Sequence, residues 1–159
     1  MRPRKLVITA LDDRIARLSG EADRKTAATW AADCAERVLP LFERKRPEDD
    51  RLRKAIDVCR AWVRTGEFRM AGIRGSSLAA HAAARSVEDD DVARSAARAA
   101  GQAVAAAHVA VHAIAAARYA VTAVWAAADR GDADAAALRE REWQYSRLFE
   151  LIRESPGKG

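Results

Sequence analysis

Ala-Ala-Gly-Gln-Ala-Val-Ala-Ala-Ala-His-Val-Ala-Val-His-Ala-Ile-Ala-Ala-Ala, residues 99–117, is the stretch that decides the fold. It has no formally charged side chain and is mostly alanine, the strongest helix former, so it predicts helix. About 20 apolar residues are enough to span a bilayer. Gln102, His108 and His112 lie inside the stretch, however, and polar side chains at such depth are costly in lipid. We therefore expect no membrane span, but a soluble protein in which other helices shield this stretch.

The helical signal continues on both sides of this stretch, from the acidic run Asp89-Asp90-Asp91 to about Asp129. Negative charge at the start complements the helix dipole. A single helix of that length would run about 60 Å at about 1.5 Å per residue, which is too long for a compact domain of this size. We expect a break near Val109 and hence two helices, although no Pro or Gly marks the break.

Five further helices are predicted from apolar spacings of three and four residues and from turn signals at their ends. Their expected limits are Thr9 to Gly20, Ala22 to Leu39 before Pro40, Pro47 to Gly66, Arg69 to Ser86, and Asp132 to about Ile152. The fold class is therefore all-α, a compact bundle of about seven helices with an Ala-rich central helix layer. We expect a single helical domain over residues 1–155 and a flexible C-terminal tail at 156–159.

Alanine accounts for 39 of the 159 residues, so the core is expected to be thin, with closely packed helices. Bulky side chains must then supply most of the apolar burial. The expected anchors are the four tryptophans, Trp30, Trp62, Trp125 and Trp143. Cys34 and Cys59 fall on inward stripes, and no export signal is recognisable. Free, buried thiols and a cytoplasmic location are the expectation.

The net charge is +5, and 23 of the 28 basic residues are arginines. A basic balance can indicate nucleic acid or an acidic partner. Each basic cluster is interleaved with acids, however, as in residues 43–51. Because the sequence has no long basic stripe with interleaved aromatic residues, we expect no nucleic-acid partner.

His81, His108 and His112 are the only histidines, and they are the strongest candidates for chemistry. In an unbroken helix, His108 and His112 would share one face at i and i+4, a spacing that can chelate a metal. No Glu accompanies them in an H-E-x-x-H pattern, and no acid lies in the neutral stretch. We therefore predict neither a metal nor a cofactor. No nucleophile elbow or phosphate-binding loop is recognisable, so no catalytic residue is predicted.

Polar side chains lie close to one helical seam through this region, provided that the break turns the chain only modestly. With a histidine from the preceding helix they form the candidate site: His81, Arg98, Gln102, His108, His112 and Tyr119. Polar groups in an apolar layer must be satisfied. They either hydrogen-bond to neighbouring helices as an internal network or line a pocket for an anionic or polar ligand, and the sequence leaves both alternatives open.

Several segments, taken in order and spacing, resemble a family of small bacterial proteins, the Imm-5-like immunity proteins. The matching segments are WAADCAERVLP at 30–40, PEDDR at 47–51, RKAI at 53–56, AHAAAR at 80–85, AARAAGQA at 96–103, AHV at 107–109, HA at 112–113, ARYA at 117–120 and EWQ at 142–144. The resemblance spans roughly residues 25–150. Family members often carry a Pro between the two histidines, where this chain has Ala110 and Val111.

The resemblance implies a cytoplasmic all-α protein that neutralises a toxin by binding it, and it supplies no catalytic residues. A protein partner is therefore expected, and a homo-oligomer stays open. Inhibitors of nuclease toxins are often acidic because they compete with nucleic acid for a basic cleft, so the charge of +5 argues against such a target. The alternative is a small-molecule-binding or catalytic helical protein that uses the candidate site as an interior pocket.

Overall fold

Seven helices joined by short connections make up the computed structural model, which describes residues 7–155. They are α1 (Asp12–Ser19), α2 (Arg24–Glu43), α3 (Arg51–Thr65), α4 (Met70–Ser86), α5 (Asp91–Ala105), α6 (Val111–Ala127) and α7 (Ala133–Glu154). Residues 7–155 contain no strand, so the predicted all-α class is confirmed. The tail expected at 156–159 lies outside the described residues.

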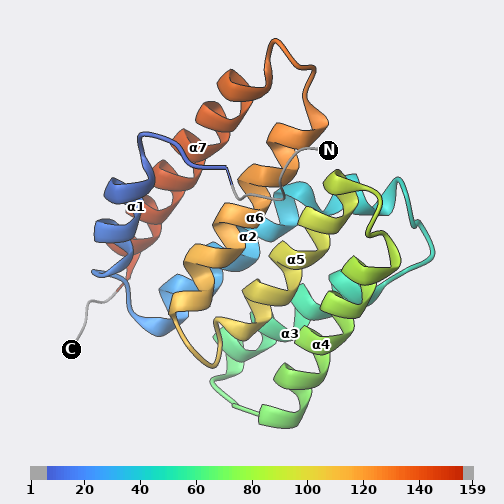
Figure 1. Ribbon diagram of the computed structural model, residues 1–159. Helices are drawn as coiled ribbons and strands as arrows, with labels where there is room; N and C mark the ends of the chain where they lie inside the picture. The colour runs from blue at the N-terminus through green and yellow to red at the C-terminus, as the bar shows by residue number, and fades with distance from the viewer. Residues whose placement is uncertain (1–6, 156–159) are drawn as a thin grey trace.

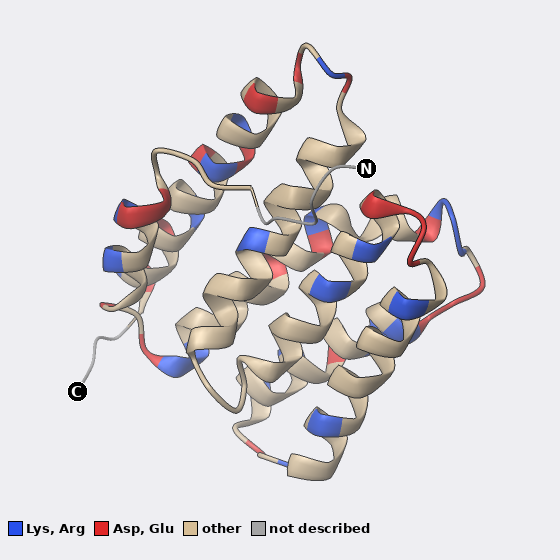
Figure 2. Cartoon of the chain, viewed as in Figure 1, with Lys and Arg blue, Asp and Glu red and all other residues tan. Residues whose placement is uncertain are grey.

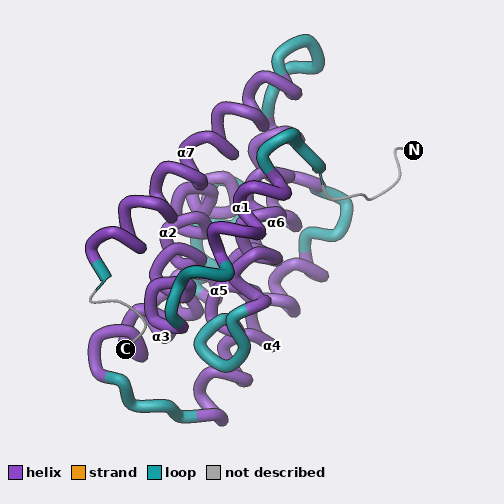
Figure 3. The backbone as a smooth tube through the Cα atoms, turned by 90° about the vertical axis from the view of Figure 1, so that its left-hand side faces the viewer, coloured by secondary structure: helices purple, strands orange, loops and turns teal. Residues whose placement is uncertain are grey.

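The helices form two layers (Figures 1 and 3). One layer consists of α4, α5 and α6, and the other of α3, α2 and α7, while α1 packs on α7. The central helix of the first layer, α5, contacts α4 and α6 beside it and α2 and α3 beneath it. The Ala-rich stretch 99–117 includes the end of α5 and the start of α6, so it lies in the middle of the bundle, as its sequence indicated.

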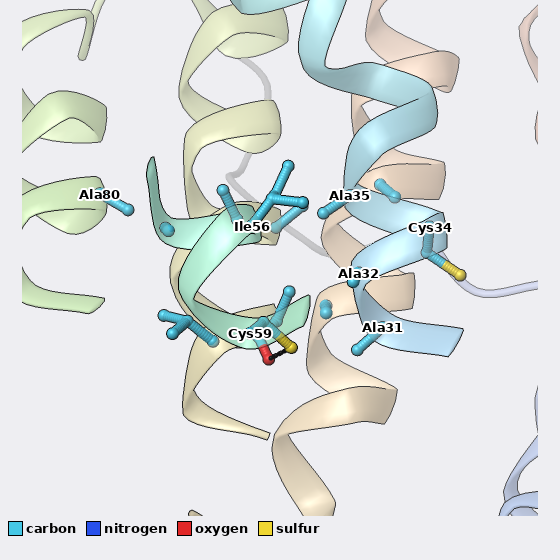
Figure 4. Packing of buried hydrophobic residues seen from close by; sticks show 14 of the residues in the cluster. Ala31, Ala32, Cys34, Ala35, Ile56, Cys59 and Ala80 are labelled. Atoms are coloured by element: carbon cyan, nitrogen blue, oxygen red, sulfur yellow. Dashed lines mark hydrogen bonds between the residues drawn. The ribbon is translucent and has the colours of Figure 1, made fainter. Parts of the chain in front are cut away.

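Small side chains account for the buried face of α5. Its buried residues are Ala93, Ser95, Ala96, Ala97, Ala99, Ala100, Gly101, Ala103 and Val104. The helices that face α5 also present alanines to it, and Ile56 and Cys59 of α3 lie among these alanines (Figure 4). Because an alanine side chain ends at Cβ, such helices approach closely, and each contact buries little apolar area. The bulky side chains that fill the core come from other helices, Trp30 and Phe42 of α2 above all.

Two of the four predicted tryptophan anchors are buried, Trp30 and Trp62. The other two are only half-buried. Trp143 lies under the guanidinium of Arg37, whose carbon is 4.0 Å from the ring centroid. Trp125 donates a hydrogen bond from Nε1 to Asp134. The expectation that all four tryptophans sit in the core was therefore wrong for these two.

The break expected near Val109 is confirmed. Helix α5 ends at Ala105, and the following backbone tightens into bonds over three residues, such as His108 N–H to the carbonyl of Ala105 at 3.0 Å. Helix α6 begins at Val111 and packs along α5. The chain reverses here without Pro or Gly, because folding back lets the apolar faces of both helices bury against α2.

Pro40 was expected to follow the end of a helix and Pro47 to begin one, but neither proline lies at a helix end. Helix α2 continues through Pro40 to Glu43, and Arg44 N–H still bonds to the carbonyl of Pro40 at 3.0 Å. Phe42, the fully buried next-to-last residue of α2, keeps this turn against the core. Pro47 lies in the α2–α3 connection, and α3 begins only at Arg51, where the Asp49 carboxylate accepts the backbone N–H of Arg51 at 3.1 Å.

A buried arginine joins four helices at the other side of the bundle. Arg141 of α7, fully buried, donates from Nε to Asp12 of α1 at 3.1 Å and from Nη1 to the side chain of Gln144 at 2.6 Å. Gln144 Nε2 donates to the carbonyl of Ala117 in α6, and Trp30 Nε1 of α2 donates to the carbonyl of Gln144, both at 2.9 Å. Burial, the largest single effect, raises the pKa of Asp12, but the hydrogen bonds from Arg141 and Thr9 and the charge of Arg141 together outweigh it, so the pKa is lowered.

Replacing Arg141 by alanine should lower the free energy of unfolding by about 3 kcal/mol or more, because it leaves the buried Asp12 carboxylate and Gln144 amide without their partner. Denaturant titration followed by circular dichroism measures the effect. Arg139→Ala, at an exposed position two residues earlier on α7, is the matched control and should change stability by no more than about 0.5 kcal/mol. Equal effects of the two variants would contradict a structural role for the buried cluster.

Candidate functional site

The outer surface of the α4–α5–α6 layer brings together four of the six candidate residues. Arg98 of α5 donates from Nη1 to Nδ1 of His81 in α4 at 2.7 Å. Gln102, one turn further along α5, pairs with His112 of α6, with 2.7 Å between Oε1 and Nδ1. All four side chains are half-buried. The seam is therefore a pair of hydrogen bonds that connect α5 to both of its neighbours.

Gly101 is the residue that lets His81 reach α5. A Cβ added at Gly101 would lie 2.7 Å from Nε2 and 2.8 Å from Cε1 of the His81 ring. The hydroxyl of Ser77, one turn before His81 on α4, donates to the carbonyl of Gly101 at 3.0 Å. The imidazole thus occupies the space that any larger side chain at 101 would fill.

The structure does not bring His108 or Tyr119 into this group. The helix break separates His108 from His112, and His108 is exposed in the α5–α6 connection. Its ring centroid lies 5.9 Å from that of Phe68, in the α3–α4 connection. Tyr119 is half-buried and packs against the hydrophobic core. The i, i+4 pairing of the two histidines depended on an unbroken helix.

His81 has a strongly lowered pKa, about 4. Burial is the main cause, and the positive charges of Arg98 and Arg85, with a smaller contribution from His112, add to it. The ring is therefore neutral at pH 7. Since Arg98 donates to Nδ1, the ring proton resides on Nε2, which faces Gly101. His81 thus accepts a hydrogen bond from Arg98, and its neutral ring lies near the positive charges of Arg98 and Arg85.

Charge is unevenly distributed between the two layers, as Figure 2 shows. The three helices α4, α5 and α6 contain five arginines and a single acid, Asp91, the first residue of α5. Asp91 pairs with Arg94 at 2.7 Å. The expectation that every basic cluster is interleaved with acids holds for residues 43–51 but is wrong for these helices.

Several arginines of the second layer are paired with carboxylates. Ion pairs join α2, α3 and α7: Arg37–Glu140, Arg53–Glu36, Arg60–Asp33 and Arg147–Asp33. Arginines without an ion pair within residues 7–155 occur in both layers: Arg24, Arg64, Arg139 and Arg153 in the second, and Arg74, Arg85, Arg98 and Arg118 in the first. Nε of Arg118 is buried and has no hydrogen-bond partner in the same part of the chain. The α4–α6 helices differ in that Asp91 is the single acid for five arginines, so most of their positive charge has no counter-ion on these helices.

A hollow of about 460 Å³ lies elsewhere, where the α2–α3 and α4–α5 connections meet. It is lined by Lys45, Arg46, Ser86, Val87, Asp89, Asp90 and Asp91. None of the six candidate residues lines it, and its charges are mixed. In the described part of the chain, no three His, Cys, Asp or Glu side chains are grouped as a metal site would require.

The two thiols are free and buried, as expected. Cys59 lies 3.5 Å from the carbonyl of Ala28 and 3.4 Å from that of Ala103 (Figure 4). Burial raises its pKa to about 12, and burial raises the pKa of Cys34 as well. Neither sulfur is a thiolate at neutral pH, so both behave as core side chains rather than nucleophiles.

Residues 17–151 match the family model described as "Imm-5 like putative immunity protein". The match extends from the end of α1 nearly to the end of α7. The chain belongs to the Imm-5-like family. Comparisons with curated proteins and with solved structures found no match. None of the helices within residues 7–155 is long and apolar enough to cross a membrane.

Gly101→Ala should destabilise the protein, because the new Cβ displaces the His81 ring and breaks its hydrogen bond with Arg98. The same substitution in a His81→Ala background should stabilise it by about 0.5–1 kcal/mol, since alanine replaces glycine in a helix with the space now empty. Denaturant unfolding of the four proteins completes a double-mutant cycle. Purely additive effects would contradict the proposed packing of His81 on Gly101.

The low pKa of His81 makes part of the stability dependent on pH. Below about pH 6.5 the unfolded chain binds a proton at this histidine. The folded chain binds it only near pH 4, so the free energy of unfolding should fall between these values as pH drops. Wild type should therefore lose stability relative to His81→Gln over this window in denaturant titrations. Replacing the exposed His108 in the same way is the control, and a constant difference for His81→Gln would contradict the assignment.

Proposed function

We propose that this protein is an immunity protein of the bacterial cytoplasm, which binds a partner toxin and neutralises it without catalysis. The observation that carries the proposal is the family match over residues 17–151. That region includes six of the seven helices nearly or fully, so the family resemblance concerns the whole bundle rather than one motif.

The arrangement of polar groups supports binding through a surface. The two hydrogen-bonded pairs of the seam face outward on α4, α5 and α6, where a macromolecule can reach them. The buried polar cluster around Arg141 is used internally, since its members bond to one another and to backbone carbonyls. The thiols are protonated inside the core. An interior pocket built from all six candidate residues is less well supported, because His108 lies apart from the others.

Titration of the partner toxin tests the proposal, and the product of the adjacent gene is the first candidate for that toxin. A non-catalytic inhibitor should abolish toxin activity at one equivalent and leave the excess toxin active below that ratio, since each bound toxin consumes one inhibitor molecule. Co-expression should restore growth of cells that produce the toxin, and a stable complex should elute from size-exclusion chromatography. Complete inactivation by substoichiometric amounts would instead show turnover, and absence of both complex and protection would overturn the proposal.

A further inference from the structure

Two parallel rows of polar residues run along the outer surface of the α4–α5–α6 layer, which we name the α4–α6 face. On α4, the row is Arg74, Ser77, His81 and Arg85, at spacings of three and four residues. On α5, it is Arg94, Arg98 and Gln102, at spacings of four residues. These spacings place each row on one side of its helix. Helix α6 adds His112 beside the α5 row.

Contacts between helices hold the rows in register. Ser77 and His81 touch Gly101, and His81 accepts the hydrogen bond from Arg98, so the α4 row borders the α5 row directly. The bond between Gln102 and His112 joins the α5 row to the first turn of α6 in the same way. The α4–α6 face is thus a single surface whose arginines are carried by helices with a fixed relative arrangement.

The charge of the α4–α6 face is available to a partner. Arg74 and Arg85 are exposed, and Arg98 donates to a neutral imidazole rather than to a carboxylate. A row of arginines without counter-ions is costly to the isolated protein, because like charges repel one another. Binding of a carboxylate relieves this repulsion and forms charge-assisted, often bidentate hydrogen bonds with the guanidinium groups.

We infer that the α4–α6 face is the docking surface for an acidic segment of the partner protein, whose Asp and Glu carboxylates pair with Arg74, Arg85 and Arg98. The inference rests on the proposed function, since it specifies which surface and which partner chemistry that function uses. The positive charge of this face has the same sign as the net charge of the whole chain, which is +5.

Apolar residues at one end of this layer favour a protein over a nucleic acid. The ring contact between Phe68 and His108 places the α3–α4 connection against the α5–α6 connection. Phe68 and Met70 on the first side, with Val109 and Val111 on the second, are 37–64% exposed. Such an apolar cluster next to arginines resembles the composition of protein interfaces. Sites for single-stranded nucleic acid combine arginines with aromatic side chains on which bases stack, and the rows on α4 and α5 contain no aromatic residue.

The opposite end of the α4–α6 face is acidic and sets a direction for the partner. Glu88, Asp89 and Asp90 form the α4–α5 connection, next to the start of α5. Arg85 lies next to this acidic end, whereas Arg98 and Arg74 lie farther from it along their helices, so most of the partner's carboxylates should lie over Arg98 and Arg74. The acidic segment should therefore extend toward the apolar cluster around Phe68, where apolar side chains of the partner can be buried.

The first test measures the affinity of the adjacent toxin for an Arg74→Glu/Arg85→Glu variant. Both positions are exposed, so the variant should fold, and circular dichroism checks this. Its affinity should fall about tenfold or more, mainly through slower association. Arg17→Glu/Arg139→Glu, an equal charge change at exposed positions on α1 and α7, is the matched control and should bind within about threefold of wild type. Toxin binding that survives in the first variant would overturn the inference and leave the proposed function intact.

A second measurement tests the inference without the toxin. It therefore remains decisive if the toxin does not bind and the proposed function is wrong. The full chain is titrated with a deca-glutamate peptide and, separately, with a single-stranded DNA decamer, while backbone amide resonances are followed by NMR. The peptide should shift resonances of α4, α5 and α6, and the shifts should shrink at high salt. Shifts confined to other helices, or tighter binding of the DNA than of the peptide, would overturn the assignment of a protein carboxylate partner.

Discussion

The close approach that alanine and glycine permit around α5 is the constraint on which the rest of this structure depends. Four helices pack against α5, and nearly every residue that it presents to them is alanine, glycine or serine. Helices with such small faces approach closely but gain little apolar burial from each contact. Stability must therefore come from elsewhere. The large side chains of α2, with Trp30 and Phe42 fully buried, and the hydrogen bonds around Arg141 provide it.

The same constraint determines where polar groups can lie. A layer of alanines leaves no interior space for a cluster of histidine, arginine and glutamine side chains, so the seam is on the outer surface. Its one deep contact, the His81 ring against α5, exists because residue 101 has no side chain. On the opposite side of α6, where α7 supplies larger residues, polar groups are buried instead, and Trp30, Arg141 and Gln144 bond to one another's groups or to a backbone carbonyl. Among the described residues, Oδ2 of Asp12 is the one oxygen of this cluster left without a hydrogen-bond partner.

Much of the fold followed from the sequence, and the failures have physical causes. Apolar spacing and alanine content predicted seven helices, and chain length predicted the break between α5 and α6. Pro40 misled because a proline removes only one hydrogen bond, and burial of Phe42 keeps the helix intact beyond it. Pro47 misled because α3 begins four residues later, at Arg51, where Asp49 accepts a backbone hydrogen bond. The pairing of Asp12 with Arg141 could not be foreseen, because 129 positions separate them and neither carries a motif.

For the candidate site, proximity was predicted for Arg98, Gln102 and His112 but failed for His108, which the break carries into a connection. The excess of arginines on three consecutive helices was readable by counting charges helix by helix, whereas averaging over clusters concealed it.

The location of α5 connects the fold to the proposed function. On its inner side, alanines pack closely against α2 and α3. On its outer side, Arg94, Arg98 and Gln102 lie between the neighbouring helices α4 and α6. A helix so tightly packed on its inner side can move little, because close-packed interiors resist deformation. Groups held this way suit recognition of a shape and a charge pattern, for which little entropy is lost on binding. His81 accepts a hydrogen bond from Arg98, and its ring is kept neutral mainly by burial, to which the positive charges of Arg98 and Arg85 add. The imidazole of His81 thus helps to position Arg98. In the proposed interaction, the arginines of this surface are the groups that bind the partner.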